Sequence, residues 1–214
     1  MAWGQNAHFF VAKKESANLP PYVIIDTTLN STTTWDETLP YVIYGGYGVI
    51  DSSTTLIINA GTQIHFSNSG GLWVYKGGTL KVQGTKDKPV VFQGLRRELS
   101  LQEEPGQWDR IWINDGGINE IDYAIIKNGF IGLQTETLFD PAMPVSLKLT
   151  NTQIRNMSGL GILARNFKIE GWNNVVSNCG IYTAAFTIGG EYEFTHCTFA
   201  NFWRFGQRST PAMY

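Results

Sequence analysis

The chain has 214 residues, of which 43% are hydrophobic and only 16% are charged, and its formal net charge is −2. This length allows one domain with a sizeable core, and the charged fraction is low against about a quarter in an average soluble protein. Because a near-neutral balance lacks the basic footprint that phosphate backbones require, we expect no nucleic-acid partner.

The first 20 residues are predicted to form an N-terminal arm, or the last strand of an upstream module, closed by Pro20 and Pro21. The first ten of them have neither the basic region nor the apolar core of a signal peptide, so none is predicted in this chain. No run of about 18 apolar residues occurs anywhere, so no transmembrane segment is predicted.

From residue 21 onward, short segments alternate apolar and polar residues, which is the pattern of strands. Glycine-containing turns at 76–79 and 83–85 separate them and supply the positive φ angles that glycine adopts readily. Leu56 and Leu80 lie 24 residues apart (80−56). We interpret the segments as three strands per coil of a repeat, and the apolar pairs are Val42/Tyr44, Leu56/Ile58, Ile64/Phe66, Leu72/Val74, Leu80/Val82 and Val90/Phe92.

In the second half an asparagine follows each apolar alternation at a regular interval. Asn128, Asn156, Asn178 and Asn201 are 28, 22 and 23 residues apart (156−128, 178−156 and 201−178). A period of this size indicates a repeat architecture. We favour an asparagine ladder with left-handed backbone at the corners over a ligand site, because stacked amides hydrogen-bond one another.

These patterns predict an all-β fold, a right-handed, single-stranded parallel β-helix of about 22–24 residues per coil over residues 21–214. Apolar residues of each coil should point inward. The predicted inward positions include Ile58, Phe66, Val74, Val82, Phe92, Ile113, Ile126, Ile154, Val176 and Phe199.

Two insertions interrupt the repeat, at residues 95–107 and 134–145. The first concentrates charge in a chain that otherwise has little. In solenoids such insertions project from the coil, often on a binding face. No evident cap for the last sheet edge follows Trp203, so we expect the chain to be a piece of a longer polypeptide and prone to edge association.

The two cysteines, Cys179 and Cys197, occupy different positions of the repeat and lack metal-ligand spacing, so two free thiols are predicted. The glycines after Asp115 do not precede a helix, so no phosphate-binding loop is predicted. We therefore expect neither a cofactor nor a metal site.

Outward aromatic residues are the ligand-binding candidates. Trp73 lies between Leu72 and Val74, and Trp112 between Ile111 and Ile113. With coils about 4.8 Å apart, the two rings should stack. We align Gly132, Gly161 and Tyr182 with them in later coils, which predicts a flat strip for the apolar face of a sugar, with Trp73, Trp112 and Tyr182 as contacts. Cover by a loop, domain or protein partner is the alternative.

Parts of the chain resemble a known family. The segments at residues 55–66 (TLIINAGTQIHF), 71–74 (GLWV), 78–85 (GTLKVQGT) and 88–94 (KPVVFQG) look like the opening coils of right-handed parallel β-helix proteins. The resemblance covers roughly residues 20–205 and is greatest to predicted surface lipoproteins of Bacteroidota. This similarity implies a cell-surface or secreted protein, with a β-sandwich module upstream and no settled activity. The lipidated cysteine expected near a lipoprotein N-terminus is absent.

Enzymes on this fold include pectate lyases and polygalacturonases, and hydrolysis requires carboxylates gathered on one face. Asp109 and Arg110, before the Ile111 strand, are the alternative catalytic pair, but the paired-aspartate and Gly-His-Gly signatures of polygalacturonases are missing. We expect a non-catalytic module for glycan or protein interaction, with a polysaccharide-active enzyme as the alternative. The carboxylates considered are Asp109, Asp115, Glu120, Asp122 and Asp140.

Overall fold

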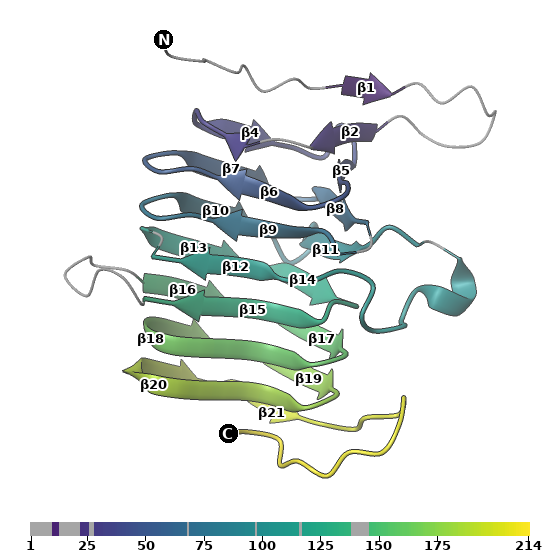
Figure 1. Ribbon diagram of the computed structural model, residues 1–214, viewed down its shortest axis with the longest axis vertical. Coiled ribbons are helices and arrows are strands. Elements are labelled where there is room, and N and C mark those ends of the chain that lie inside the picture. Colours follow the sequence, from purple (N-terminus) through teal and green to yellow (C-terminus); the bar gives the residue numbers. More distant parts are fainter. Residues whose placement is uncertain are drawn as a thin grey trace.

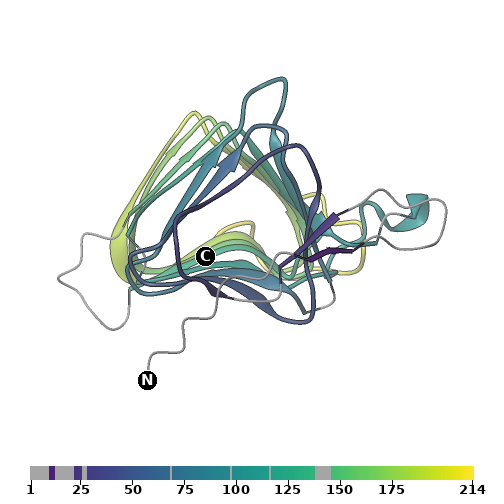
Figure 2. The ribbon, with the colours of Figure 1, turned by 90° about the horizontal axis from the view of Figure 1, so that it is seen from above.

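The chain folds as a right-handed parallel β-helix, as predicted (Figure 1). The computed structural model describes residues 10–12, 22–25, 28–67, 69–96, 98–115, 117–137 and 146–214. Viewed along its axis, the coil has a triangular outline with three faces (Figure 2). No helix among these described residues is long and apolar enough to cross a membrane.

One face is a nine-stranded sheet, in which eight strands are parallel and a single antiparallel strand lies at one edge. That strand, β1 (Phe10–Ala12), is the described part of the predicted arm, and the rest of residues 1–20 lies outside the described residues. The parallel strands are β2 (Tyr22–Ile25), β5 (Tyr41–Ile43), β8 (Gln63–Phe66), β11 (Val90–Gly94), β14 (Ala124–Lys127), β17 (Gln153–Met157), β19 (Val175–Cys179) and β21 (Thr198–Ala200).

The other two faces belong to one twelve-stranded sheet, because the long strands β18 (Leu160–Trp172) and β20 (Tyr182–Thr195) run through both. The second face contains β3 (Thr28–Leu29), β6 (Tyr47–Ile50), β9 (Gly71–Val74), β12 (Ile111–Asn114) and β15 (Ile131–Glu136). The third face contains β4 (Thr33–Trp35), β7 (Thr55–Asn59), β10 (Thr79–Gln83), β13 (Ile118–Asp122) and β16 (Ser146–Thr150).

The predicted core is confirmed. Nine of the ten predicted inward residues, from Ile58 to Val176, are at most 1% exposed. The tenth, Phe199, is partly buried against the same cluster. Ile154, Val176 and Phe199 form one register column with steps of 22 and 23 residues (176−154 and 199−176), which matches the predicted period.

The register of one early strand differs from the prediction. Tyr41 pairs with Ile64 and Ile43 with Phe66, so Tyr41 and Ile43 point inward rather than Val42 and Tyr44. Tyr44 is 66% exposed. All four residues from 41 to 44 are apolar, so no apolar–polar alternation shows which of them face inward. A slip of one residue then exchanges the inward and outward faces of the strand.

The corner asparagines adopt the expected backbone, and Asn178 and Asn201 hydrogen-bond the backbone of the neighbouring coil, but among the described residues their amides do not hydrogen-bond one another. Asn128, Asn156 and Asn178 have φ angles of 69°, 55° and 54°. The amide ladder lies at another corner, where Asn173 donates to Asn151 over 2.8 Å and Asn151 donates to Asp122 over 2.8 Å.

Beside that ladder an inward column links successive coils. The backbone N–H of Ala124 donates to Thr152 Oγ1 (3.2 Å), that of Thr152 to Asn174 Oδ1 (3.0 Å), and that of Asn174 to Cys197 Sγ (3.4 Å). Cys179 and Cys197 are free thiols, as predicted.

The prediction of an uncovered sheet edge after Trp203 is partly wrong. Residues 204–214 fold back, and Tyr214 exchanges backbone hydrogen bonds of 3.0 Å with Ala184 and Phe186. These bonds cover the first half of β20. Along the second half the described chain adds no further strand, and Ile188 is 69% exposed.

Candidate functional site

Trp73 and Trp112 stack on the second face, as their place in the repeat predicts. They pair directly in register, and their ring centroids are 4.9 Å apart with planes 9° from parallel. Both side chains are half-buried. Rings so close and so nearly parallel overlap face to face, so each Trp turns its flat face toward the other and presents its edge outward. We call the outer surface of β6, β9, β12 and β15 the aromatic face.

The column that continues this pair differs from the predicted one. Trp112 pairs with Gln134, and Gln134 with Leu163. The predicted Gly132, Gly161 and Tyr182 therefore lie outside the column. Tyr182 pairs with Leu160 and lies beside Tyr214, with ring centroids 5.4 Å apart. The offset arises because Ile111 aligns with Leu133 rather than Ile131. A Cβ at Gly132 would lie 2.5 Å from Ile154 Cγ2, and one at Gly161 would clash with Val176 Cγ1, so both glycines face the core and do not form the predicted outward strip.

Tyr47 closes the upper side of the Trp pair. Its ring is edge-on to Trp73 at 6.3 Å and to Trp112 at 6.4 Å, and its hydroxyl donates to Asp109 Oδ2. A Cβ at Gly71 would lie 2.6 Å from the Tyr47 ring, so this contact requires glycine. Burial, followed by the hydrogen bond to Asp109 and the charge of that carboxylate, raises the pKa of Tyr47.

Asp109 and Arg110, the alternative catalytic pair, lie on this same face. Arg110 Nε and Nη2 donate to Asp109 Oδ1 over 3.0 and 2.8 Å, and Arg110 Nη1 donates to Gln134 Oε1. The Arg110 guanidinium also lies 5.8 Å from the centre of the Phe130 ring. The side chains of Arg110 and Asp109 are 21% and 24% exposed.

A second carboxylate that the sequence analysis missed, Glu136, lies on the far side of Gln134. It is 3% exposed. Its oxygens accept hydrogen bonds from Trp112 Nε1 (2.7 Å), Asn114 Nδ2 (3.1 Å) and Gln134 Nε2 (3.3 Å), and Arg165 Nη1 lies 3.6 Å away. A buried carboxylate needs such partners, so Glu136 fixes the Trp112 ring and ties three coils together.

The other acidic candidates are scattered. Asp122 accepts from Thr150 Oγ1 (2.6 Å) at a corner, Glu120 is exposed on the third face and Asp115 is buried at the end of β12. Asp140 lies outside the described residues. Within the described ranges no three His, Cys, Asp or Glu side chains gather where they could hold a metal ion.

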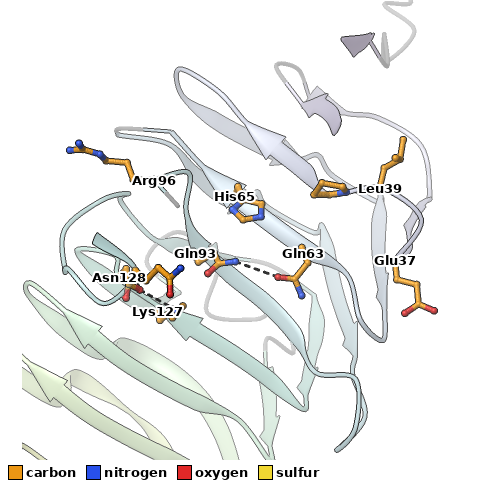
Figure 3. A pocket seen from close by; sticks show the side chains of 10 residues that line it. Glu37, Leu39, Gln63, His65, Gln93, Arg96, Lys127 and Asn128 are labelled. Atoms are coloured by element: carbon orange, nitrogen blue, oxygen red, sulfur yellow. Dashed lines mark hydrogen bonds between the residues drawn. The ribbon is translucent and has the colours of Figure 1, made fainter. Parts of the chain in front are cut away.

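A groove of about 460 Å³ lies on the outer surface of the nine-stranded sheet (Figure 3). Its floor consists mainly of the outward side chains of Gln63, His65, Gln93 and Lys127, and its walls are the turn at residues 36–40 and the 95–107 insertion. Gln93 Nε2 donates to Gln63 Oε1 over 3.3 Å. We call this cavity the amide groove, and the sequence analysis did not predict it.

A clamp on Glu103 holds the insertion against the sheet. Lys127 Nζ donates to Glu103 Oε1 over 2.9 Å, and Arg155 and Asn156 donate to Glu103 Oε2. Asn128 Nδ2 donates to the backbone oxygen of Gln102. Burial acts to raise the pKa of Glu103, but the hydrogen bonds and charges of Lys127 and Arg155 outweigh it and hold that pKa below its usual value.

The sequence contained two signals for this wall. The insertion concentrates charged residues, and two of the repeated asparagines, at 128 and 156, lie at the ends of strands beneath it. Their partners could not be named without the path of the insertion, which carries only a short 3₁₀ turn, η1 (Leu99–Leu101).

Comparison with known families finds one match. The family model of the pectate-lyase like β-helix domain matches residues 27–120. This range contains Trp73, Asp109, Arg110 and Trp112, and it ends before Gln134 and Glu136. No curated protein and no solved structure matches the chain. The match supports the β-helix fold and at most a role related to polysaccharides.

Proposed function

We propose that the chain is a non-catalytic β-helix module, secreted or held at the cell surface, that contacts a glycan through the aromatic face. The observation that carries this is the juxtaposition of aromatic edges with a polar row. Trp73 and Trp112 border Asp109, Arg110 and Gln134 on one surface. A sugar presents apolar C–H groups beside hydroxyls, and this surface offers a complementary partner for each.

The aromatic face is also pre-organised. The Trp rings are fixed by each other, and the Trp112 indole N–H is fixed by Glu136. Tyr75, whose ring is edge-on to Trp73 at 5.2 Å, is 40% exposed and supplies an accessible aromatic contact. A ligand that binds such a surface meets little cost of ordering side chains.

A test of this proposal uses side chains whose removal spares the core. In affinity electrophoresis, Tyr75→Ala and Arg110→Ala should each weaken about tenfold the affinity for a polysaccharide that retards the parent protein. The melting temperature of Tyr75→Ala should stay nearly unchanged. The matched control is Tyr44→Ala, because Tyr44 is an exposed aromatic residue on another face. If no polysaccharide in a broad panel retards the protein, or if the control variant weakens binding equally, the proposal is wrong.

A polysaccharide-active enzyme is the second candidate, because Asp109 and Glu136 share one face with Arg110 and Gln134 between them. Glycoside hydrolysis needs one carboxyl group to donate a proton and a second to act on the sugar or a water. Both carboxylates here already accept several hydrogen bonds, which favours the binding role. We expect purified protein to release no oligosaccharides. Reproducible release of oligosaccharides that Asp109→Asn abolishes would favour the enzyme function over the binding function.

A protein partner is a further use of the same face, since Trp, Tyr and Arg dominate the energetic centres of interfaces. Retention of a surface protein in a pull-down, lost in Tyr75→Ala, would favour it over a glycan. The upstream β-sandwich module and the lipoprotein anchor remain proposals from the resemblance. Cell fractionation of the source organism with an antibody to this chain tests the surface location.

A further inference from the structure

We infer that the amide groove is a second binding site, for an uncharged, hydroxyl-rich segment of a neutral polysaccharide lying along the helix axis. The groove belongs to the nine-stranded sheet, whereas the aromatic face belongs to the twelve-stranded sheet. The two surfaces share no residue. The inference therefore does not depend on the glycan contact proposed for the aromatic face.

The direction of the groove follows from strand register. His65 of β8 pairs with Gln93 of β11, and Gln93 is followed along the same outward column by Lys127 of β14. The floor therefore climbs one coil at a time, in steps of about 4.8 Å. One sugar unit of an extended chain is comparable in length to such a step, so successive units would meet equivalent positions of successive coils.

The chemistry of the floor is that of amides. Gln93 Nε2 donates to Gln63 Oε1, which leaves the side-chain oxygen of Gln93, Oε1, without a partner within the described part of the chain. An amide presents a donor and an acceptor side by side, which is the pattern that neighbouring sugar hydroxyls satisfy. Figure 3 shows both side chains at the centre of the groove, with Lys127 and Asn128 on one side of them and Leu39 on the other.

Charge argues for a neutral ligand. Each of the three charged side chains that line the groove has an opposite charge beside it: Glu37 has Lys88 (2.7 Å), Arg96 has Glu98 (3.7 Å) and Lys127 has Glu103 (2.9 Å). An ionic ligand would have to compete with these existing pairs. A neutral hydroxyl-rich ligand leaves them intact.

The experiment compares neutral and acidic polysaccharides on the 214-residue chain. The neutral probes are xyloglucan, glucomannan and mixed-linkage β-glucan in affinity electrophoresis gels, and the acidic probe is polygalacturonate. We expect retardation by at least one neutral probe. Replacing both floor amides, Gln63→Leu with Gln93→Leu, should weaken that affinity at least about tenfold through the lost hydrogen bonds.

The control is Gln153→Leu. Gln153 lies in the same outward column as Gln63, through Val91 and Ile125, but outside the groove. It should leave retardation unchanged. If the double variant unfolds at a lower temperature than the parent, the single change Gln93→Asn, which only shortens the amide, replaces it and should still weaken binding.

Three results would overturn the inference. The first is that no neutral probe retards the protein, and the second is that polygalacturonate retards it more strongly than every neutral probe. The third is that retardation survives the folded glutamine variants. If retardation survives them and is lost in Tyr75→Ala, the sugar binds the aromatic face instead, which supports the proposed function while rejecting the groove.

Discussion

The aromatic face and the amide groove are built in different ways. The aromatic face consists of strand residues and of residues directly beside strands, such as Tyr75, Asp109 and Arg110, and its Trp pair and Glu136 follow from coils stacking in register. The groove has a strand floor but one wall that is an insertion, held by the Glu103 clamp. The difference teaches that the first surface is as stable as the fold, whereas the second can be opened locally.

The largest expected effect removes both surfaces together. Val176 is fully buried in the core that both sheets share, so Val176→Asp should cost several kcal/mol by burying an unpaired carboxylate. Val175→Asp is the matched control, because its neighbour Val175 is 42% exposed. Urea unfolding measures both. If Val176→Asp unfolds like the parent, the register is wrong.

The next effect is specific to the aromatic face. Trp112→Ala removes a stacked, half-buried ring and one of the donors to Glu136, so we expect a loss of about 2–4 kcal/mol in unfolding free energy. Trp172→Ala, at a site that is 51% exposed, should cost less than half of that. Groove binding should persist in folded Trp112→Ala. An unchanged stability would mean that the Trp pair is a surface feature without a structural role.

A smaller effect is specific to the groove. Glu103→Gln weakens the clamp, and since Glu103 is 38% exposed, we expect about 1 kcal/mol or less in global stability. Hydrogen exchange should still accelerate for amides at residues 98–107. Glu104→Gln serves as control, because Glu104 makes no ion pair among the described residues. Equal exchange in both variants would show that other contacts hold the insertion.

The smallest effect is the pH dependence of the clamp. The pKa of Glu103 is held below its reference value of 4.5 in the folded chain. The stabilisation is therefore complete above pH 4.5 and is lost as the pH falls below it toward the folded pKa. Protection factors of residues 98–107 should decline over that range, and Glu103→Gln should remove the decline. A decline that persists in the variant would implicate another group.

The sequence predicts the fold better than either surface, and the errors have a common cause. Alternation with period two identifies inward residues such as Ile154, but it detects neither a shift of two residues nor a local break in the alternation. It therefore aligns Trp112 with Gly132, which faces the core, instead of Gln134. At Tyr41–Ile43 even the parity is undefined. The sequence does not reveal Glu136 and Glu103 because their partners come from other coils, 22 to 53 residues away.

The inward corner column that runs from Ala124 to Cys197 has a mechanical consequence. In addition to the strand hydrogen bonds, one side chain of each coil in this column accepts a hydrogen bond from a backbone N–H of the preceding coil. A force that pulls the last coils away from the stack must therefore release them one after another. In the regular part each release frees 22 or 23 residues (176−154 and 199−176). At about 3.3–3.6 Å per extended residue, the tether would lengthen in steps of roughly 75–80 Å.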